Sequence, residues 1–208
     1  MASPTSDHRR TPVEFGLSDV GHEPSWAHVS GWAQLSGSRQ TVSCIVACAN
    51  QARALVKLLP MLSDTLTECG YPWELIAVDC ASTDETLAVL SPWAELPGIR
   101  LLQVDPPQDT AQCFAAGMLR ARGDAVICID PAVAHPPGLI AQMILRWESN
   151  AMLVHARRDT AYGHSVLTQW DEAEMQRRIR RSDFVLPPEC TQLGLLDRQL
   201  IDWMMQAG

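Results

Sequence analysis

Single carboxylates stand directly after two apolar segments of the chain, where acidic groups are well placed to bind a ligand. Asp79 follows the segment 73–78, and Asp130 follows the uninterrupted apolar segment 125–129. A carboxylate so placed can accept a hydrogen bond from an N–H group or supply an oxygen ligand to a hard divalent cation. What the two carboxylates can do therefore depends on the elements that hold them.

The segments around these carboxylates alternate between short apolar runs and longer amphipathic ones from Thr41 onward. This alternation is typical of an α/β fold with an open, mostly parallel sheet flanked by helices. Right-handed crossovers would make that sheet doubly wound. Strands are predicted at 42–47, 73–79, 99–104, 125–129 and 152–155, with helices between them and further helices at 166–181 and 197–205.

Local signals predict how several of these helices begin and end. Asn50 is expected to cap the first helix, and Pro60 is expected to kink it or restart it. Ser82 with Glu85 three residues later matches a capping box at the start of the second helix. Gly123 is expected to end the third helix in a left-handed conformation.

The loops that follow the strands are the expected ligand-binding region, because ligands of doubly wound sheets bind beyond the carboxyl ends of the strands. These loops are 47–50, 79–84 and 130–135. A structural interpretation stays open beside this one, in which Asp79 and Asp130 only cap the following helices. His135 could be a lone metal ligand, but a loop histidine hydrogen-bonded to backbone is favoured.

Composition excludes several classes of function. The chain has 208 residues with 16 basic and 24 acidic side chains, which gives a formal charge of −8. Because nucleic-acid binding needs a basic surface, we expect no nucleic-acid partner. No apolar run approaches the ~20 residues that span a bilayer, and no early apolar run follows a basic start. We therefore expect no transmembrane segment and no signal peptide, and a cytoplasmic location.

Domain limits and cysteine state can also be predicted. Residues 1–40 carry scattered proline, glycine and serine without a helical or strand period, so we expect a flexible extension before one domain at 41–208. The chain has 7 cysteines and no C-x-x-C pair. Reduced, buried thiols are therefore favoured over a disulfide or zinc framework.

Four segments, in order and spacing, resemble the catalytic domain of glycosyltransferase family two, which has the GT-A fold. They are VSCIVACANQARAL at 42–55, GYPWELIAVDCASTDETLAVL at 70–90, AAGMLRARGDAVICIDPAVAHPPGLI at 115–140 and LPPECTQLGLLDR at 186–198. The resemblance is strongest to polyprenyl-phosphate sugar transferases of the dolichol-phosphate mannose synthase type. It implies a nucleotide-sugar donor of the UDP, GDP or dTDP type. The nucleotide contacts that it implies are Ala47, Asn50, Asp79, Ser82 and Asp130.

The chain departs from the family pattern at several of these positions. The family sequence Pro-x-Tyr-Asn-Glu is here ACANQ at 47–51, which keeps only the Asn. Asp-Asp-Gly-Ser is DCAS at 79–82, which keeps the first carboxylate. In the family, Asp-x-Asp holds Mg²⁺ or Mn²⁺ against the diphosphate, but here it reads DPA at 130–132. Asp130 is therefore the one metal ligand that the motif still offers, which makes a Mg²⁺ or Mn²⁺ cofactor doubtful.

The acceptor motif of the family, Asp-Phe-Arg, is replaced by QLG at 192–194. An amide cannot take a proton at neutral pH, and loss of a general base typically costs about 10² to 10⁴ in rate. We therefore predict a nucleotide-sugar-binding domain whose transfer activity is impaired or absent, kept as a pseudoenzyme or as a module that binds a protein partner. No catalytic residue is assigned.

Two alternatives remain from the sequence. The first is an active, metal-independent glycosyltransferase in which Arg157 and Arg158 bind the diphosphate, since guanidinium groups bind phosphate well. The second is a peripheral membrane adaptor that uses the arginine cluster at 177–181 beside Trp170 for membrane surface contact. A solvated helix is favoured over the second alternative, because acidic and basic residues lie four apart on it.

Overall fold

The computed structural model describes residues 15–16, 40–105, 109–133, 136, 138–158, 165–180 and 188–207. The predicted extension at 1–40 lies almost entirely outside these residues, as does the prediction for His135.

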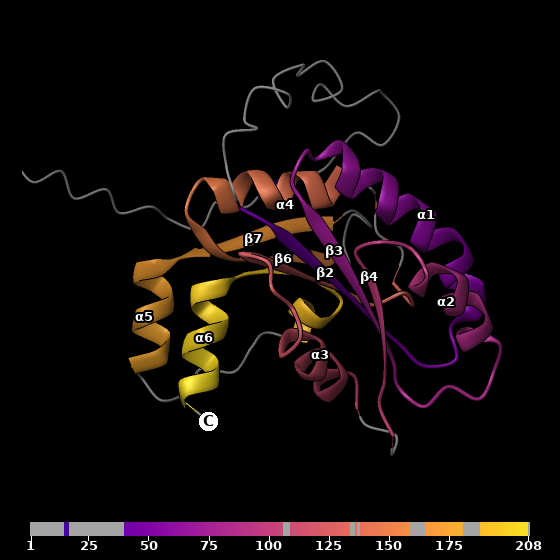
Figure 1. Ribbon diagram of the computed structural model, residues 1–208. Helices are drawn as coiled ribbons and strands as arrows, with labels where there is room; N and C mark the ends of the chain where they lie inside the picture. The colour runs from indigo at the N-terminus through magenta and orange to yellow at the C-terminus, as the bar shows by residue number, and fades with distance from the viewer. Residues whose placement is uncertain are drawn as a thin grey trace, which may run out of the picture.

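The described strands form one sheet of eight strands (Figure 1). In spatial order they are β1 (Phe15–Gly16), β7 (Ser165–Asp171), β6 (Ala151–Arg158), β8 (Leu193–Asp197), β5 (Ala125–Ile129), β2 (Val42–Cys48), β3 (Trp73–Asp79) and β4 (Ile99–Gln103). Strands β5, β2, β3 and β4 are parallel, and β8 runs antiparallel to both β5 and β6. Strands β2 to β6 therefore all point the same way, which confirms the predicted α/β fold with a mostly parallel open sheet.

Helices cover both faces of the sheet (Figure 1). One face carries α1 (Ala52–Glu68), α2 (Thr86–Ala94) and α4 (Gly138–Glu148), whose apolar residues share one buried cluster. The other face carries α3 (Thr110–Met118), α5 (Glu172–Arg180), the short 3-10 helix η3 (Pro188–Thr191) and α6 (Arg198–Ala207), which share a second cluster. The sheet thus forms the middle layer of three.

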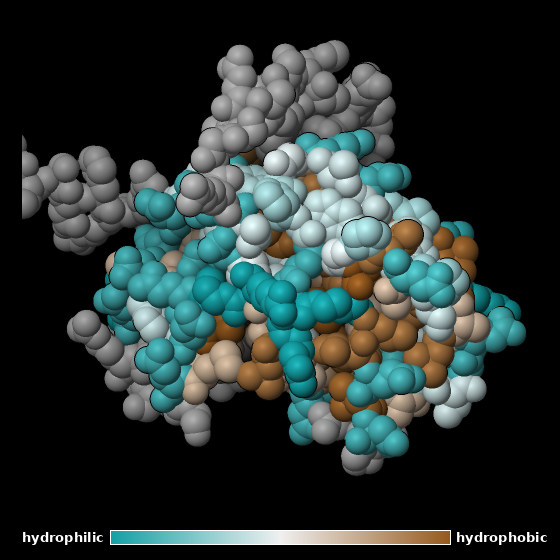
Figure 2. Space-filling view, viewed as in Figure 1, coloured by the Kyte–Doolittle hydropathy of each residue, from teal (hydrophilic) through white to brown (hydrophobic). Residues whose placement is uncertain are grey.

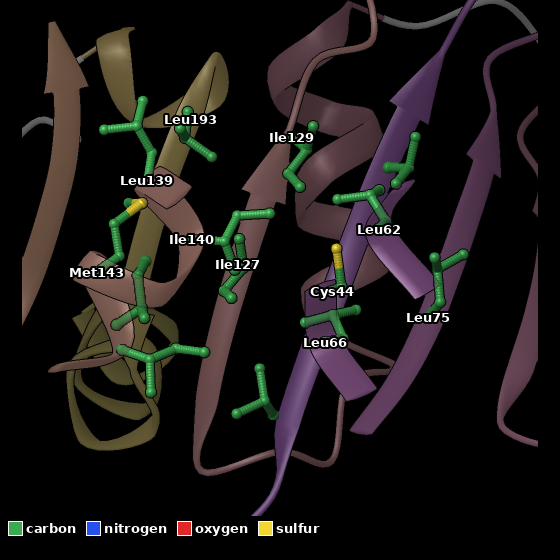
Figure 3. Close-up of a cluster of buried hydrophobic side chains, with 14 of the residues drawn as sticks. Cys44, Leu62, Leu66, Leu75, Ile127, Ile129, Leu139, Ile140, Met143 and Leu193 are labelled. Carbon is green, nitrogen blue, oxygen red and sulfur yellow. The ribbon is translucent and has the colours of Figure 1, made fainter. Parts of the chain in front are cut away.

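Strand β2 shows why apolar runs become central strands. Its side chains alternate between the two clusters, with Cys44 and Val46 on one face and Ile45 and Ala47 on the other. Every residue of β2 is buried, as expected for a parallel strand covered on both faces. Figure 3 shows Leu62 and Leu66 of α1 over Cys44 and Leu75, and Met143 and Ile140 of α4 near Ile127. Each such side chain contributes about 1.5 to 3 kcal/mol on burial.

Strand β4 is the outermost strand on one side of the sheet and pairs only with β3 among the described strands. Figure 2 shows hydrophobic side chains gathered over the region of β4 and α2. Leu96, just before β4, is 49% exposed, and Leu119 beyond α3 is 64% exposed.

The prediction of a helix at 166–181 is wrong in its first half. Residues 165–171 form β7, and only 172–180 are helical, as α5. Val166 and Leu167 pair with Arg157 and Ala156 of β6, so sheet pairing outweighs the helical spacing that the sequence shows. Strand β8 was not predicted, because its run LGLLD is short and contains a glycine.

Three predicted helix ends are also wrong. Gln51, not Asn50, is the N-cap residue of α1, which continues through Pro60 as a single helix. The capping box of Ser82 and Glu85 does not form, because α2 begins at Thr86 and Glu85 makes no side-chain cap bond.

Gly123 has no left-handed φ, and α3 ends earlier, with Leu119 as its C-cap. The glycine is required for a different reason. A Cβ at this position would lie 2.5 Å from the backbone nitrogen of Ser43. The close approach of the β5 entry to β2 therefore excludes any side chain here.

The cysteines depart in one respect from the prediction of reduced thiols. Cys80 and Cys113 form a disulfide that joins the end of β3 to α3, with Cα atoms 6.4 Å apart. Their sequence separation of 33 hides this proximity in the sequence. The remaining cysteines are buried and lie outside this disulfide: Cys44, Cys48, Cys69, Cys128 and Cys190. Burial raises the pKa of Cys44 to about 12, so this thiol stays protonated at neutral pH.

Within the described part of the chain, no helix combines the length and apolar character needed to cross a membrane.

Candidate functional site

The candidate site lies at the end of the sheet where β3, β2, β5 and β6 finish. We call this row of carboxyl ends of the strands the edge. Asp79 is the last residue of β3 and lies opposite Cys48 of β2. Asp130 follows β5, and its backbone N–H donates to the carbonyl of Gln192 at 3.0 Å. Because neighbouring strands lie about 4.8 Å apart, the two aspartates, two strands apart, share one stretch of edge about 10 Å long. The structure thus brings together the residues that the sequence placed at strand ends.

Asp79 is a buried carboxylate with one oxygen unpaired. Only 2% of the residue is exposed. Its Oδ2 accepts a 3.3 Å hydrogen bond from the backbone N–H of Ser82, but its buried Oδ1 has no hydrogen-bond partner among the described residues. A buried acceptor without a partner costs about 1 to 3 kcal/mol, and more when it is charged. Asp79 Oδ1 is therefore suited to receive an N–H donor from a ligand.

Asn50 and Ser82 join the loops that follow β2 and β3. The Asn50 side-chain oxygen accepts hydrogen bonds from the backbone N–H groups of Thr83 at 2.8 Å and Asp84 at 3.2 Å. The Ser82 hydroxyl oxygen accepts from the backbone N–H of Asn50 at 2.9 Å. Asn50 and Ala81 have left-handed φ values of 56° and 55°, so the network holds two strained residues in place. The two loops form one fixed unit rather than separate arms.

Asp84 and Thr86 reinforce this unit, and sequence reasoning missed both. The Asp84 carboxylate accepts from the Thr86 N–H at 2.9 Å and from its hydroxyl at 2.5 Å, and it reaches the Ala52 N–H at 3.4 Å. The hydrogen bond from the Thr86 side chain is the main reason why the pKa of Asp84 is lowered. An Asp two residues before a Thr was the available signal, because Asp side chains often bond backbone two residues on.

Asp130 is half-buried, and its carboxylate accepts hydrogen bonds from other groups of the protein. Its Oδ1 accepts from the backbone N–H of Ala132 at 2.8 Å and from Gln51 Nε2 at 3.2 Å. Mg²⁺ and Mn²⁺ prefer several oxygen ligands, but Ala132 replaces the second carboxylate of the motif. Among the described residues, no group of three His, Cys, Asp or Glu side chains could hold a metal ion. The described residues thus offer only Asp130 where the family motif has two carboxylates. This arrangement does not fit the metal site of the family, for which the sequence predicted Asp130 as a ligand.

The remaining residues that the sequence linked to nucleotide, diphosphate or acceptor binding lie at separate positions in the structure. Ala47 is buried in β2 within the second apolar cluster, so only its backbone can face the edge. Arg157 is exposed at the carboxyl end of β6, opposite Val166 of β7. Arg158 ends the same strand, and its side chain lies outside the described part of the chain. Gln192 is exposed beside Asp130, where β8 begins.

An open α/β sheet with polar residues gathered beyond its parallel strands is an architecture that binds nucleotides. The sequence profile of Glycosyl transferase family 2 matches residues 43–201. The chain belongs to this family, and the match spans every element that positions the edge.

Curated relatives carry glycosyltransferase names. An uncharacterised glycosyltransferase of Synechocystis is 25% identical over 167 residues, which cover 79% of this chain and 52% of that protein. An undecaprenyl-phosphate 4-deoxy-4-formamido-L-arabinose transferase of Pseudomonas fluorescens is 26% identical, over 79% of this chain and 49% of its own length. The chain spans about half the length of the curated relatives it matches.

Solved structures confirm the GT-A fold. A mannosyltransferase of Pyrobaculum calidifontis, solved with GDP-Man and Mn²⁺, gives a TM-score of 0.57 at 19% identity over 81% of this chain and 47% of that one. Glucosyl-3-phosphoglycerate synthase of Mycobacterium tuberculosis, solved with UDP, gives 0.55 at 19% identity over 86% and 63%. At such identities the likeness establishes the fold alone.

Proposed function

We propose that this domain binds a nucleotide sugar beyond the carboxyl ends of β3, β2 and β5, with Asp79 accepting an N–H of the base. The observation that carries the proposal is the buried, unpaired Oδ1 of Asp79. Family membership supports it, as do structural neighbours that were solved with GDP-Man or UDP.

The proposal includes impaired or absent sugar transfer. Ala132 has no ligand atom to offer a cation, and Gln192 has no proton-accepting group at neutral pH where the family places a carboxylate. Loss of a general base alone lowers a rate by about 10² to 10⁴. Missing charge neutralisation at the diphosphate adds several kcal/mol to the barrier. The domain would then act by binding, and a protein partner remains part of the proposal.

Isothermal titration calorimetry with UDP, GDP and dTDP sugars tests the binding. Replacing Asp79 by Asn removes the charge but keeps the volume. A hydrogen bond to a charged group contributes about 1.5 to 3 kcal/mol, so Asp79→Asn should weaken binding about 10- to 100-fold. Asp64→Asn changes an exposed carboxylate on α1 and serves as the control, with unchanged affinity expected. Equal affinities of the wild type and Asp79→Asn would contradict the assignment.

A working, metal-independent transferase is the second candidate, and the position of Arg157 favours it. This exposed guanidinium lies at the same edge as Asp130, separated from it only by β8 in the sheet order. Product formation with lipid-linked or soluble acceptors in the presence of EDTA, lost in Arg157→Gln, would support this candidate over the binding module.

Arg177 and Arg178 of α5 are already engaged in contacts within the fold, which weighs against a membrane-surface role. Glu174 forms ion pairs with both Arg177 and Arg178. The Arg178 guanidinium also lies 4.1 Å from the centre of the Trp170 ring. These contacts favour the solvated helix, and we propose no membrane surface for it.

A further inference from the structure

We infer that Gln51 binds Asp130 in place of a divalent cation, so that this carboxylate positions the loops of the edge and is not a metal ligand. The inference concerns the site of the proposed function, but its main test requires no nucleotide. It starts from the disagreement between the residues at this edge and the metal that the family implies.

Both polar atoms of the Gln51 side-chain amide make contacts. Its Nε2 donates to Asp130 Oδ1 at 3.2 Å, and its Oε1 faces the backbone N–H of Ala49 at 3.4 Å. Asp130 Oδ1 also accepts from the N–H of Ala132 at 2.8 Å. One oxygen of this carboxylate thus already accepts two hydrogen bonds from the protein, without a cation.

Gln51 also connects three loops that lie far apart in the sequence. It is the N-cap residue of α1, and its backbone N–H donates to the Thr86 hydroxyl at 2.9 Å. Its side chain reaches Asp130, 79 residues away, at the end of β5. The loops after β2, β3 and β5 therefore meet at this one residue. Removing the Gln51 amide would therefore weaken the contacts that hold these three loops together.

The residue type at position 51 decides which partner Asp130 can take. A Glu has almost the same shape as Gln but would place a second carboxylate oxygen about 3.2 Å from Asp130 Oδ1. Two carboxylates so close repel each other when both are charged, and a divalent cation between them removes the repulsion. In Gln51→Glu, the contact between residue 51 and Asp130 should therefore require a cation, whereas in the wild type it does not.

Thermal unfolding with and without Mn²⁺ tests this inference on five proteins: the wild type, Asp130→Asn, Gln51→Glu, Gln51→Glu with Asp130→Asn, and Gln206→Glu. The last is the matched control, because Gln206 is exposed on α6. We expect Gln51→Glu to unfold at a lower temperature than the wild type without metal. Saturating Mn²⁺, at a hundred times its dissociation constant, should raise its midpoint by about 5 °C or more. The double variant, the wild type and Gln206→Glu should show no saturable shift.

A saturable Mn²⁺ shift of the wild type that disappears in Asp130→Asn would overturn the inference, because Asp130 would then be a cation ligand. Lack of any Mn²⁺ effect on a folded Gln51→Glu would overturn it as well. If Gln51→Glu does not fold, the Mn²⁺ shifts of the wild type and of Asp130→Asn still show whether Asp130 is a cation ligand.

Calorimetry separates this inference from the proposed function. Equal nucleotide-sugar affinity of the wild type in EDTA and in Mn²⁺ supports the inference, whereas a tenfold gain with Mn²⁺ that requires Asp130 overturns it. Absence of binding under both conditions would refute the proposed function alone, because the unfolding experiment would be unaffected.

Discussion

Asn50 offers a quantitative test of how the edge is held together. Its side-chain oxygen accepts from two backbone N–H groups, those of Thr83 and Asp84, and its own φ is 56°. Asn50→Ala removes both hydrogen bonds and places a less tolerant residue in the left-handed region. Because these bonds are exposed, we take about 0.5 to 1 kcal/mol for each, and about 1 kcal/mol for the backbone. The total predicted loss of unfolding free energy is about 2 to 3 kcal/mol.

The chain provides a matched control for this substitution. Asn150, after α4, is also exposed and also left-handed, with a φ of 68°, but none of the side-chain hydrogen bonds found involves it. Asn150→Ala should therefore lose only the backbone part, about 1 kcal/mol. Urea unfolding of the two variants should differ by about 1 to 2 kcal/mol. If both variants lost the same free energy, the side-chain bonds of Asn50 would contribute nothing and the loops would not be joined as described.

Two further predictions concern the opposite end of the sheet. Gly123→Ala should lower the unfolding free energy by about 2 kcal/mol or more in urea, because its Cβ would meet the backbone nitrogen of Ser43 at 2.5 Å; a loss below 0.5 kcal/mol would contradict this close approach. Burial would raise the pKa of Glu74, but hydrogen bonds from Ser43 and the Arg122 N–H and the charge of Arg100 lower it overall. Its stabilisation should thus be present above the ordinary Glu pKa of about 4.3 and lost as the pH falls below it, so Glu74→Gln should show less loss of stability between pH 6 and pH 3 than the wild type.

The parallel half of the sheet could be predicted from the sequence because its strands are buried on both faces. Such strands appear as short apolar runs, and the prediction of β5 at 125–129 matches the structure at both ends. The antiparallel half could not be predicted in the same way. Residues 165–171 show helical spacing, and they form a strand only because β6 lies beside them. Pairing with a distant segment decided the outcome there.

The candidate site could be predicted in position but not in its contacts. Asp79 and Asp130 were identified because each follows an apolar run, which fixes their place at the edge. Thr83, which donates to Asn50, and Asp130, which accepts from Gln51, lie more than 30 residues from these partners, and the spacing of residue types carries no signal for such contacts. The side-chain oxygen of Asn50 does not cap α1 because it accepts from the backbone N–H groups of Thr83 and Asp84 instead.

The most direct test of the account is a crystal structure of the protein with a nucleotide sugar selected by calorimetry. We predict that a base N–H lies about 2.7 to 3.2 Å from Asp79 Oδ1. A nucleotide bound with its base away from Asp79, or bound elsewhere on the molecule, would contradict the central claim.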